Sequence, residues 1–88
     1  MGSWKLKIEE VLSERQRTHG SFQSVAETAQ ALKAIIHHAK DMAPHHLEAL
    51  DLIATKIARI CHGDPYERDH WIDIQGYAML ASLKDDND

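Results

Sequence analysis

The sequence predicts an all-α fold, because apolar residues recur with the period of an α-helix and glycine or proline interrupts them at intervals. Four segments show this pattern, at residues 3–18, 24–40, 44–62 and 66–84. No stretch alternates apolar and polar residues for long enough to predict a strand. We therefore expect a compact, four-helix, bundle-like domain made of two helical hairpins.

The chain length predicts one domain, spanning residues 1–88. Domains usually contain ~100 residues or more, so 88 residues can build one core and not two. A domain of this size buries only ~60–65% of the surface that its unfolded chain exposes. We therefore expect oligomerisation, most simply as a homodimer, to complete the core.

The first predicted helix begins at Ser3, whose side chain can cap it, and ends near residue 18. Its apolar stripe has helical spacing and consists of Trp4, Ile8, Val11 and Leu12. Gly20 follows as the left-handed stop that helices favour. The second helix is predicted to start at Ser24, because Ser24 and Glu27 have the spacing of a capping box. Its inner face comprises Val25, Ala29, Leu32, Ile36 and Ala39.

The third predicted helix begins at Pro44, whose missing N–H is no loss in a first turn, and Gly63 closes it. Its stripe is the most strongly apolar in the chain, with Leu47, Leu50, Ala54, Ile57 and Cys61, and Ile53 and Ile60 beside them. Cys61 on this stripe is expected to be a buried, inert thiol.

The fourth predicted helix is apolar on nearly all sides, which is typical of a central helix. We accordingly expect Trp71 and Tyr77 to be largely buried. The apolar residues of this helix are Trp71, Ile72, Ile74, Ala78, Met79, Leu80 and Leu83.

Charge and cysteine content exclude several classes of protein. Fourteen acidic and ten basic residues give a net charge of −4, which argues against a whole-surface grip on a nucleic-acid backbone. The lone Cys61 cannot form an intramolecular disulfide, and no apolar run resembles a signal peptide or a membrane span. We expect a cytoplasmic protein that does not contact a membrane.

The most informative polar residues lie on the third and fourth helices. Asp69, Asp73 and Tyr77 are four residues apart and form one stripe beside apolar positions. A carboxylate there requires a partner, and Lys56 and Arg59 on the third helix are the candidates. One interpretation is a structural salt bridge between the two helices. The other is that these five residues form a binding site for a phosphate compound.

Glu48 and Asp51 are three residues apart and could bind a divalent cation together with Asp69 and Asp73. On an exposed helix such a pair is more often a solvated surface. The doublets His37-His38 and His45-His46 flank a turn. Adjacent side chains on a helix point about 100° apart, so we interpret these histidines as solvated rather than metal-binding.

Four segments of the chain are distinctive: Lys56-Ile57-Ala58-Arg59-Ile60, Gly63-Asp64-Pro65, Asp69-His70-Trp71-Ile72-Asp73-Ile74-x-Gly76-Tyr77-Ala78, and Glu14-Arg15-x-Arg17-Thr18-His19-Gly20-Ser21-Phe22. Together they resemble a family of small phage and prophage proteins of unassigned function.

The fourth helix is also similar, more distantly, to the last core helix of all-α nucleoside triphosphate pyrophosphohydrolases of the MazG type. That resemblance implies magnesium held by two Glu-rich motifs on facing helices. The second helix here carries a single acid, Glu27, where those enzymes have a Glu-x-x-Glu pair.

We therefore expect a non-catalytic phage-type accessory protein that binds a macromolecular partner, a host or phage protein, and needs no cofactor. The alternative is a MazG-like nucleotide-binding protein or magnesium-dependent pyrophosphohydrolase. Direct DNA binding fits the helix count and not the charge.

Overall fold

The computed structural model describes residues 3–84 of the chain, and side chains from residue 7 onward. The side chain of Trp4 therefore lies outside the described part. Four helices are present: α1 (Ser3–His19), α2 (Phe22–Ala39), α3 (Pro44–His62) and α4 (Arg68–Ser82). The described residues form no strand, and the all-α prediction is confirmed.

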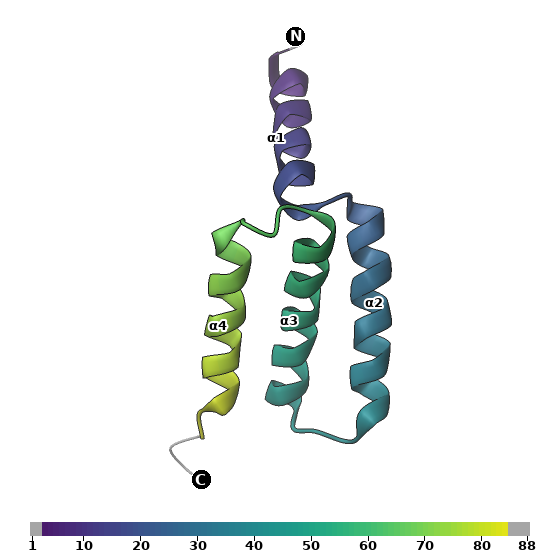
Figure 1. The fold of residues 1–88 in the computed structure, drawn as a ribbon, viewed down its shortest axis with the longest axis vertical. Helices are drawn as coiled ribbons and strands as arrows, with labels where there is room; N and C mark the ends of the chain where they lie inside the picture. The colour runs from purple at the N-terminus through teal and green to yellow at the C-terminus, as the bar shows by residue number, and fades with distance from the viewer. Residues whose placement is uncertain (1–2, 85–88) are drawn as a thin grey trace.

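Helices α2, α3 and α4 run antiparallel and side by side, with α3 in the middle (Figure 1). Their packing is that of a small all-α bundle. The two helical hairpins are α2–α3 and α3–α4, and they share α3. Helix α1 instead extends from one end of the layer, which makes the molecule 55 Å long and 28 by 27 Å across.

The start of α2 corrects the predicted helix boundary. The side chain of Ser21 accepts a hydrogen bond from the backbone N–H of Ser24 at 3.2 Å, so the helix begins at Phe22. Glu27, expected to complete a capping box with Ser24, accepts from Gln23 at 3.4 Å. Two serines stand close enough together for either to cap, and the earlier one does so.

The other helix ends follow the predicted signals. Gly20 has φ of +85°, the left-handed conformation that ends α1. Pro44 occupies the first position of α3. At the far end of α3, Gly63 donates its N–H to the carbonyl of Arg59 at 2.8 Å.

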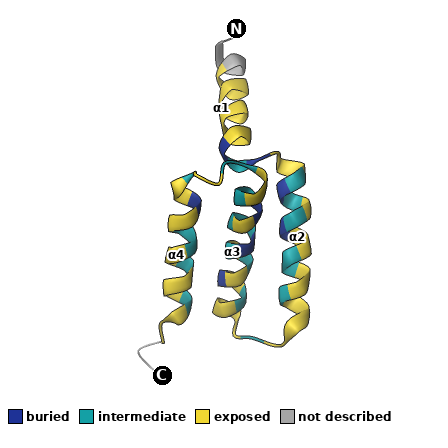
Figure 2. Ribbon diagram, in the orientation of Figure 1, coloured by how far each residue is buried: buried dark blue, intermediate teal, exposed yellow. Residues whose placement is uncertain are grey.

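Few of the described residues are buried (Figure 2), and alanine dominates the buried apolar core. Its members are Val25, Ala29, Ala49, Ala54 and Ala58. Alanines let helix backbones approach closely, and they leave the larger side chains of α3 at the edges of the contact. Leu50 and Ile57 are 37% and 39% exposed, and Cys61 is exposed too. The prediction of a buried thiol is wrong, because no helix of the same chain covers that side of α3.

The predicted central position of α4 is also wrong. Helix α4 lies at the edge of the layer and packs along α3, and its first turn meets α1 where His70 contacts Thr18 and His19. Trp71 is 48% exposed, contrary to expectation, and Tyr77 is half-buried. A helix that is apolar on nearly all sides needs cover on all sides, and here only one side receives it. Within residues 3–84, no helix combines the length and the apolar character needed to cross a membrane.

Candidate functional site

The layer formed by α2, α3 and α4 has two faces, and one of them carries the predicted polar site residues together with the exposed Leu52 and Leu80. Thr55 and Arg59 of α3 share a cavity with Lys33 of α2, and Glu48 of α3 shares a groove with Tyr77 of α4. These residues therefore lie on one side of the layer. We call this side the polar face, and all seven predicted site residues lie on it or at its edges: Glu48, Asp51, Lys56, Arg59, Asp69, Asp73 and Tyr77.

The opposite side of the layer carries large apolar groups. At about 100° per residue, Leu50, Ile57 and Cys61 stand roughly half a turn away from Thr55 and Arg59 on α3. The same geometry places Ile35 of α2 and Trp71 of α4 on this side. We call it the apolar face, defined by Ile35, Leu50, Ile57, Cys61 and Trp71, all of them exposed.

On the polar face, Lys56 Nζ lies 2.8 Å from Asp73 Oδ2 and joins α3 to α4, so Asp73 pairs with one of its two candidate partners. The hydrogen bond from Lys56 lowers the pKa of Asp73 below its ordinary value. Asp73 was expected to be the buried partner, but its side chain is 44% exposed and that of Lys56 only 13%. The ammonium group of Lys56 has therefore lost more of its hydration than the carboxylate has, and the ion pair compensates for that loss.

The other three predicted binding residues do not join this pair. Arg59 turns toward α2 and lines a cavity there. Tyr77 lines a shallow groove nearer the far end of the layer. Asp69 is exposed and makes no ion pair with any side chain of residues 7–84. The five residues thus share a face without forming one cluster.

The carboxylates proposed for magnesium are also dispersed. Asp51 accepts a hydrogen bond from His37 Nε2 at 2.9 Å, across α2 and α3. Glu48 is exposed at the edge of the groove. Among the side chains that the structure describes, no three His, Cys, Asp or Glu gather in a way that could hold a metal ion. A single copy of the chain therefore does not assemble Glu48, Asp51, Asp69 and Asp73 as a ligand set.

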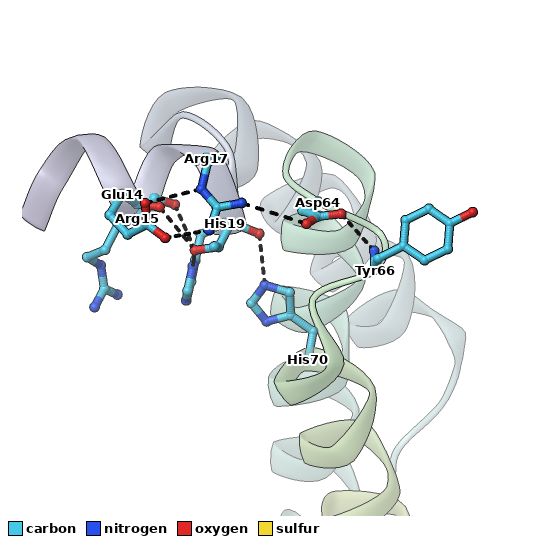
Figure 3. A network of polar contacts seen from close by, with 8 residues as sticks. Glu14, Arg15, Arg17, His19, Asp64, Tyr66 and His70 are labelled. Carbon is cyan, nitrogen blue, oxygen red and sulfur yellow. Dashed lines mark hydrogen bonds and ion pairs between the residues drawn. The ribbon is translucent and has the colours of Figure 1, made fainter.

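Sequence reasoning missed a junction where α1, α3 and α4 meet (Figure 3). The carbonyl of Thr18 accepts from the N–H of Asp64 at 3.2 Å and from His70 Nε2 at 3.1 Å. His70 is 1% exposed and is the largest fully buried side chain. Its ring packs edge-on against that of His19, with centroids 4.6 Å apart. The junction holds the end of α1 against the first turn of α4.

Two glycines make this junction possible. A Cβ on Gly63 would lie 2.4 Å from the carbonyl oxygen of Thr18 and 2.7 Å from the nitrogen of Gly20. A Cβ on Gly20 would lie 2.6 Å from the backbone of His62. The available sequence signal was a glycine after α1 and after α3, which marks a helix end but does not identify what packs against it.

Ion pairs extend the junction outward. Arg17 pairs with Glu14 in the preceding turn, and this contact lowers the pKa of Glu14 and raises that of Arg17. Arg17 also lies 4.0 Å from Asp64. Several residues behind the phage-family resemblance, among them Thr18, Gly63 and His70, therefore have structural roles.

Comparison with known proteins gives one match. The model of a family described as a domain of unknown function (DUF6378) matches residues 7–84. No curated protein and no solved structure matches the chain.

Proposed function

For a chain that belongs to the DUF6378 family of unknown function, we propose the role of a non-catalytic accessory protein of phage or prophage type. It acts in the cytoplasm of the bacterial host by binding a macromolecular partner. The observation that carries this proposal is the amount of large apolar surface that the four helices leave uncovered.

The apolar face is best explained by a second copy of the chain. Among the side chains that the structure describes, the buried apolar core is one valine and four alanines, which is little to offset the conformational entropy lost on folding. A permanent interface that buries Leu50, Ile57 and Trp71 would add apolar surface to this small core. Only another copy of the same chain is always present at synthesis, and a two-fold axis lets one face cover its own equivalent.

Helix α1 supplies a separate apolar surface for the partner protein. It extends beyond the layer, and Ile8, Val11 and Leu12 form a stripe that is 48%, 57% and 57% exposed. An amphipathic helix of this kind binds by laying its apolar side into a groove of another protein. The polar side of α1, which includes Glu10 and Arg17, would remain in solvent.

The dimer can be tested with a matched pair of substitutions. Leu50 and Leu52 are neighbours on α3 with almost equal exposure, 37% and 36%, and they point to opposite faces of the layer. We expect light scattering to report a dimer for the wild type and for Leu52→Glu, and a monomer for Leu50→Glu. A monomeric wild type, or equal effects of the two changes, would contradict a dimer built on the apolar face.

Partner binding can be tested by photocrosslinking in cells that express the protein. A crosslinking residue at Val11 should give one defined protein adduct, and the same residue at Glu10, on the other side of α1, should not. The adduct should disappear when Leu12 is changed to Glu. Indiscriminate adducts from both positions, or none from position 11, would refute the role assigned to α1.

The alternative function, a magnesium-dependent nucleotide pyrophosphohydrolase, has weaker support. It requires carboxylates that converge on one ion, and Asp51 and Asp73 are engaged by His37 and Lys56. Hydrolysis of a nucleoside triphosphate that depends on magnesium and is lost in Asp73→Asn would favour this alternative over the accessory role.

A further inference from the structure

A cavity at the junction of α1, α2 and α3 has the chemistry of an anion site. It measures about 250 Å³ and is lined by cationic side chains from three helices: Arg15 of α1, Lys33 of α2 and Arg59 of α3. His19 and Phe22 also line it, and no Asp or Glu does. In a chain with net charge −4, three cations around one cavity are a local reversal of sign.

These cations are not neutralised by neighbouring carboxylates. The ion pairs among the described side chains involve Arg17, His37 and Lys56, and none involves Arg15, Lys33 or Arg59. Lys33 and Arg59 are half-buried, so water screens their charges less than it screens those of exposed side chains. Three like charges held together without counter-charges favour a multivalent anion.

The ring of His19 lies among the same positive charges. Burial lowers the pKa of its ring, and the charges of His70, Arg59, Arg15 and Lys56 lower it further. These groups reach His19 from α1, α3 and α4, and Lys33 faces the same cavity from α2. An anion bound among them would stabilise protonated His19 and raise its pKa.

We propose that this cavity binds the phosphate chain of a di- or triphosphate compound. The volume is below the roughly 300–1,000 Å³ typical of pockets that enclose a drug-sized ligand, so it can hold phosphate groups and not a whole nucleotide. Phe22, 85% exposed at the cavity, offers a ring on which a nucleobase could stack outside it. The site is independent of the proposed partner binding, because it uses neither the apolar face nor the α1 stripe.

Titration calorimetry without magnesium tests the site, with pyrophosphate, tripolyphosphate and adenosine triphosphate as probes. All three should bind to the wild type. Lys33→Gln and Arg59→Gln should each weaken binding by about tenfold or more, as expected for the loss of a charge-assisted contact. Lys40→Gln is the matched control: Lys40 follows the last residue of α2, is exposed and does not line the cavity, so its loss should change affinity by less than about twofold.

Two further readouts identify the ligand and locate it. If the natural ligand is a nucleotide, Phe22→Ala should lower the affinity for adenosine triphosphate and leave the affinity for tripolyphosphate unchanged. If Phe22→Ala changes neither affinity relative to the wild type, the natural ligand is a free polyphosphate. In proton NMR, tripolyphosphate should raise the pKa of His19. Absence of binding by every probe, or equal losses in Lys33→Gln and Lys40→Gln, would overturn the proposal, and Lys33→Gln suffices if Arg59→Gln does not fold.

Discussion

His70 and Thr18, 52 residues apart in the chain, are joined by a hydrogen bond of 3.1 Å from the imidazole Nε2–H to the backbone carbonyl. Because the acceptor is a carbonyl, the proton must be on Nε2. The same carbonyl accepts from the N–H of Asp64, so one peptide group of α1 holds both the α3–α4 connection and the first turn of α4.

Replacing His70 by alanine should destabilise the fold by about 2–3 kcal/mol, because it removes this bond and leaves a void where a fully buried ring stood. His38→Ala, at an exposed histidine of α2, should change stability by less than about 0.5 kcal/mol. Denaturant melts at one fixed protein concentration measure both. Similar values for the two variants would mean that the junction contributes little.

Two glycine-to-alanine changes should have opposite signs. Gly63→Ala pushes a Cβ against the backbone of Thr18 and Gly20 and should cost about 1–3 kcal/mol. Gly76 lies inside α4 with no atom within 4 Å of an added Cβ, so Gly76→Ala should stabilise by about 0.5–1 kcal/mol. A stabilising Gly63→Ala would show that α1 does not stay packed against the α3–α4 connection.

The Lys56–Asp73 pair should appear in the pH dependence of stability. The folded-state pKa of Asp73 lies below its ordinary value of 3.8, so the pair contributes fully above pH 3.8 and this contribution is lost as the pH falls through the lower value. Asp73→Asn should therefore lower the melting temperature at about pH 7 and have little effect at about pH 2. Because Asp73 is 44% exposed, we expect a smaller loss than for Gly63→Ala.

Asp69→Asn is the control for this measurement, since Asp69 lies one turn earlier on α4, is exposed, and makes no ion pair among the described residues. It should leave the melting temperature nearly unchanged at neutral pH. If the two variants behave alike, the pair with Lys56 has no measurable effect on stability.

The reaction rate of the Cys61 thiol shows whether the apolar face is buried in an interface. It is the one cysteine of the chain, and it is exposed when a single copy is considered. In a dimer closed over this face, Cys61 should react slowly with a thiol reagent, and dilution or Leu50→Glu should accelerate the reaction by about tenfold or more. A wild-type rate that is fast and independent of concentration would argue for a free face.

The sequence alone predicted most helix ends, because the signals that set them act over a few residues. Gly20 ends α1 through its own φ, and Pro44 begins α3 through its missing N–H. Ser21 and Ser24 show the limit of such reasoning, since both can cap and only the folded chain selects one. The Lys56–Asp73 pair was also predictable, because the spacing of both residues placed them at the edges of facing helices.

The candidate sites depended on information that the sequence does not contain. The cavity of Arg15, Lys33 and Arg59 joins three helices, so it depends on how α1 leaves the layer. That direction is set by Gly20 and Gly63 packing backbone to backbone. Likewise, the carboxylates proposed for magnesium share a face, but the partners His37 and Lys56 engage two of them separately.

By itself, the amino-acid sequence determined that this chain folds as four helices, since helical periodicity and end signals are local properties of the backbone and its side chains. Only the tertiary structure decided that α3 is central, that α4 lies at an edge, and that Trp71 and Cys61 are exposed. The physical reason is that an apolar stripe indicates which side of a helix favours burial, but it does not identify the element that buries it. Ala54 and Ala58 are buried by other helices of the same chain, whereas the larger side chains of the apolar face stay exposed.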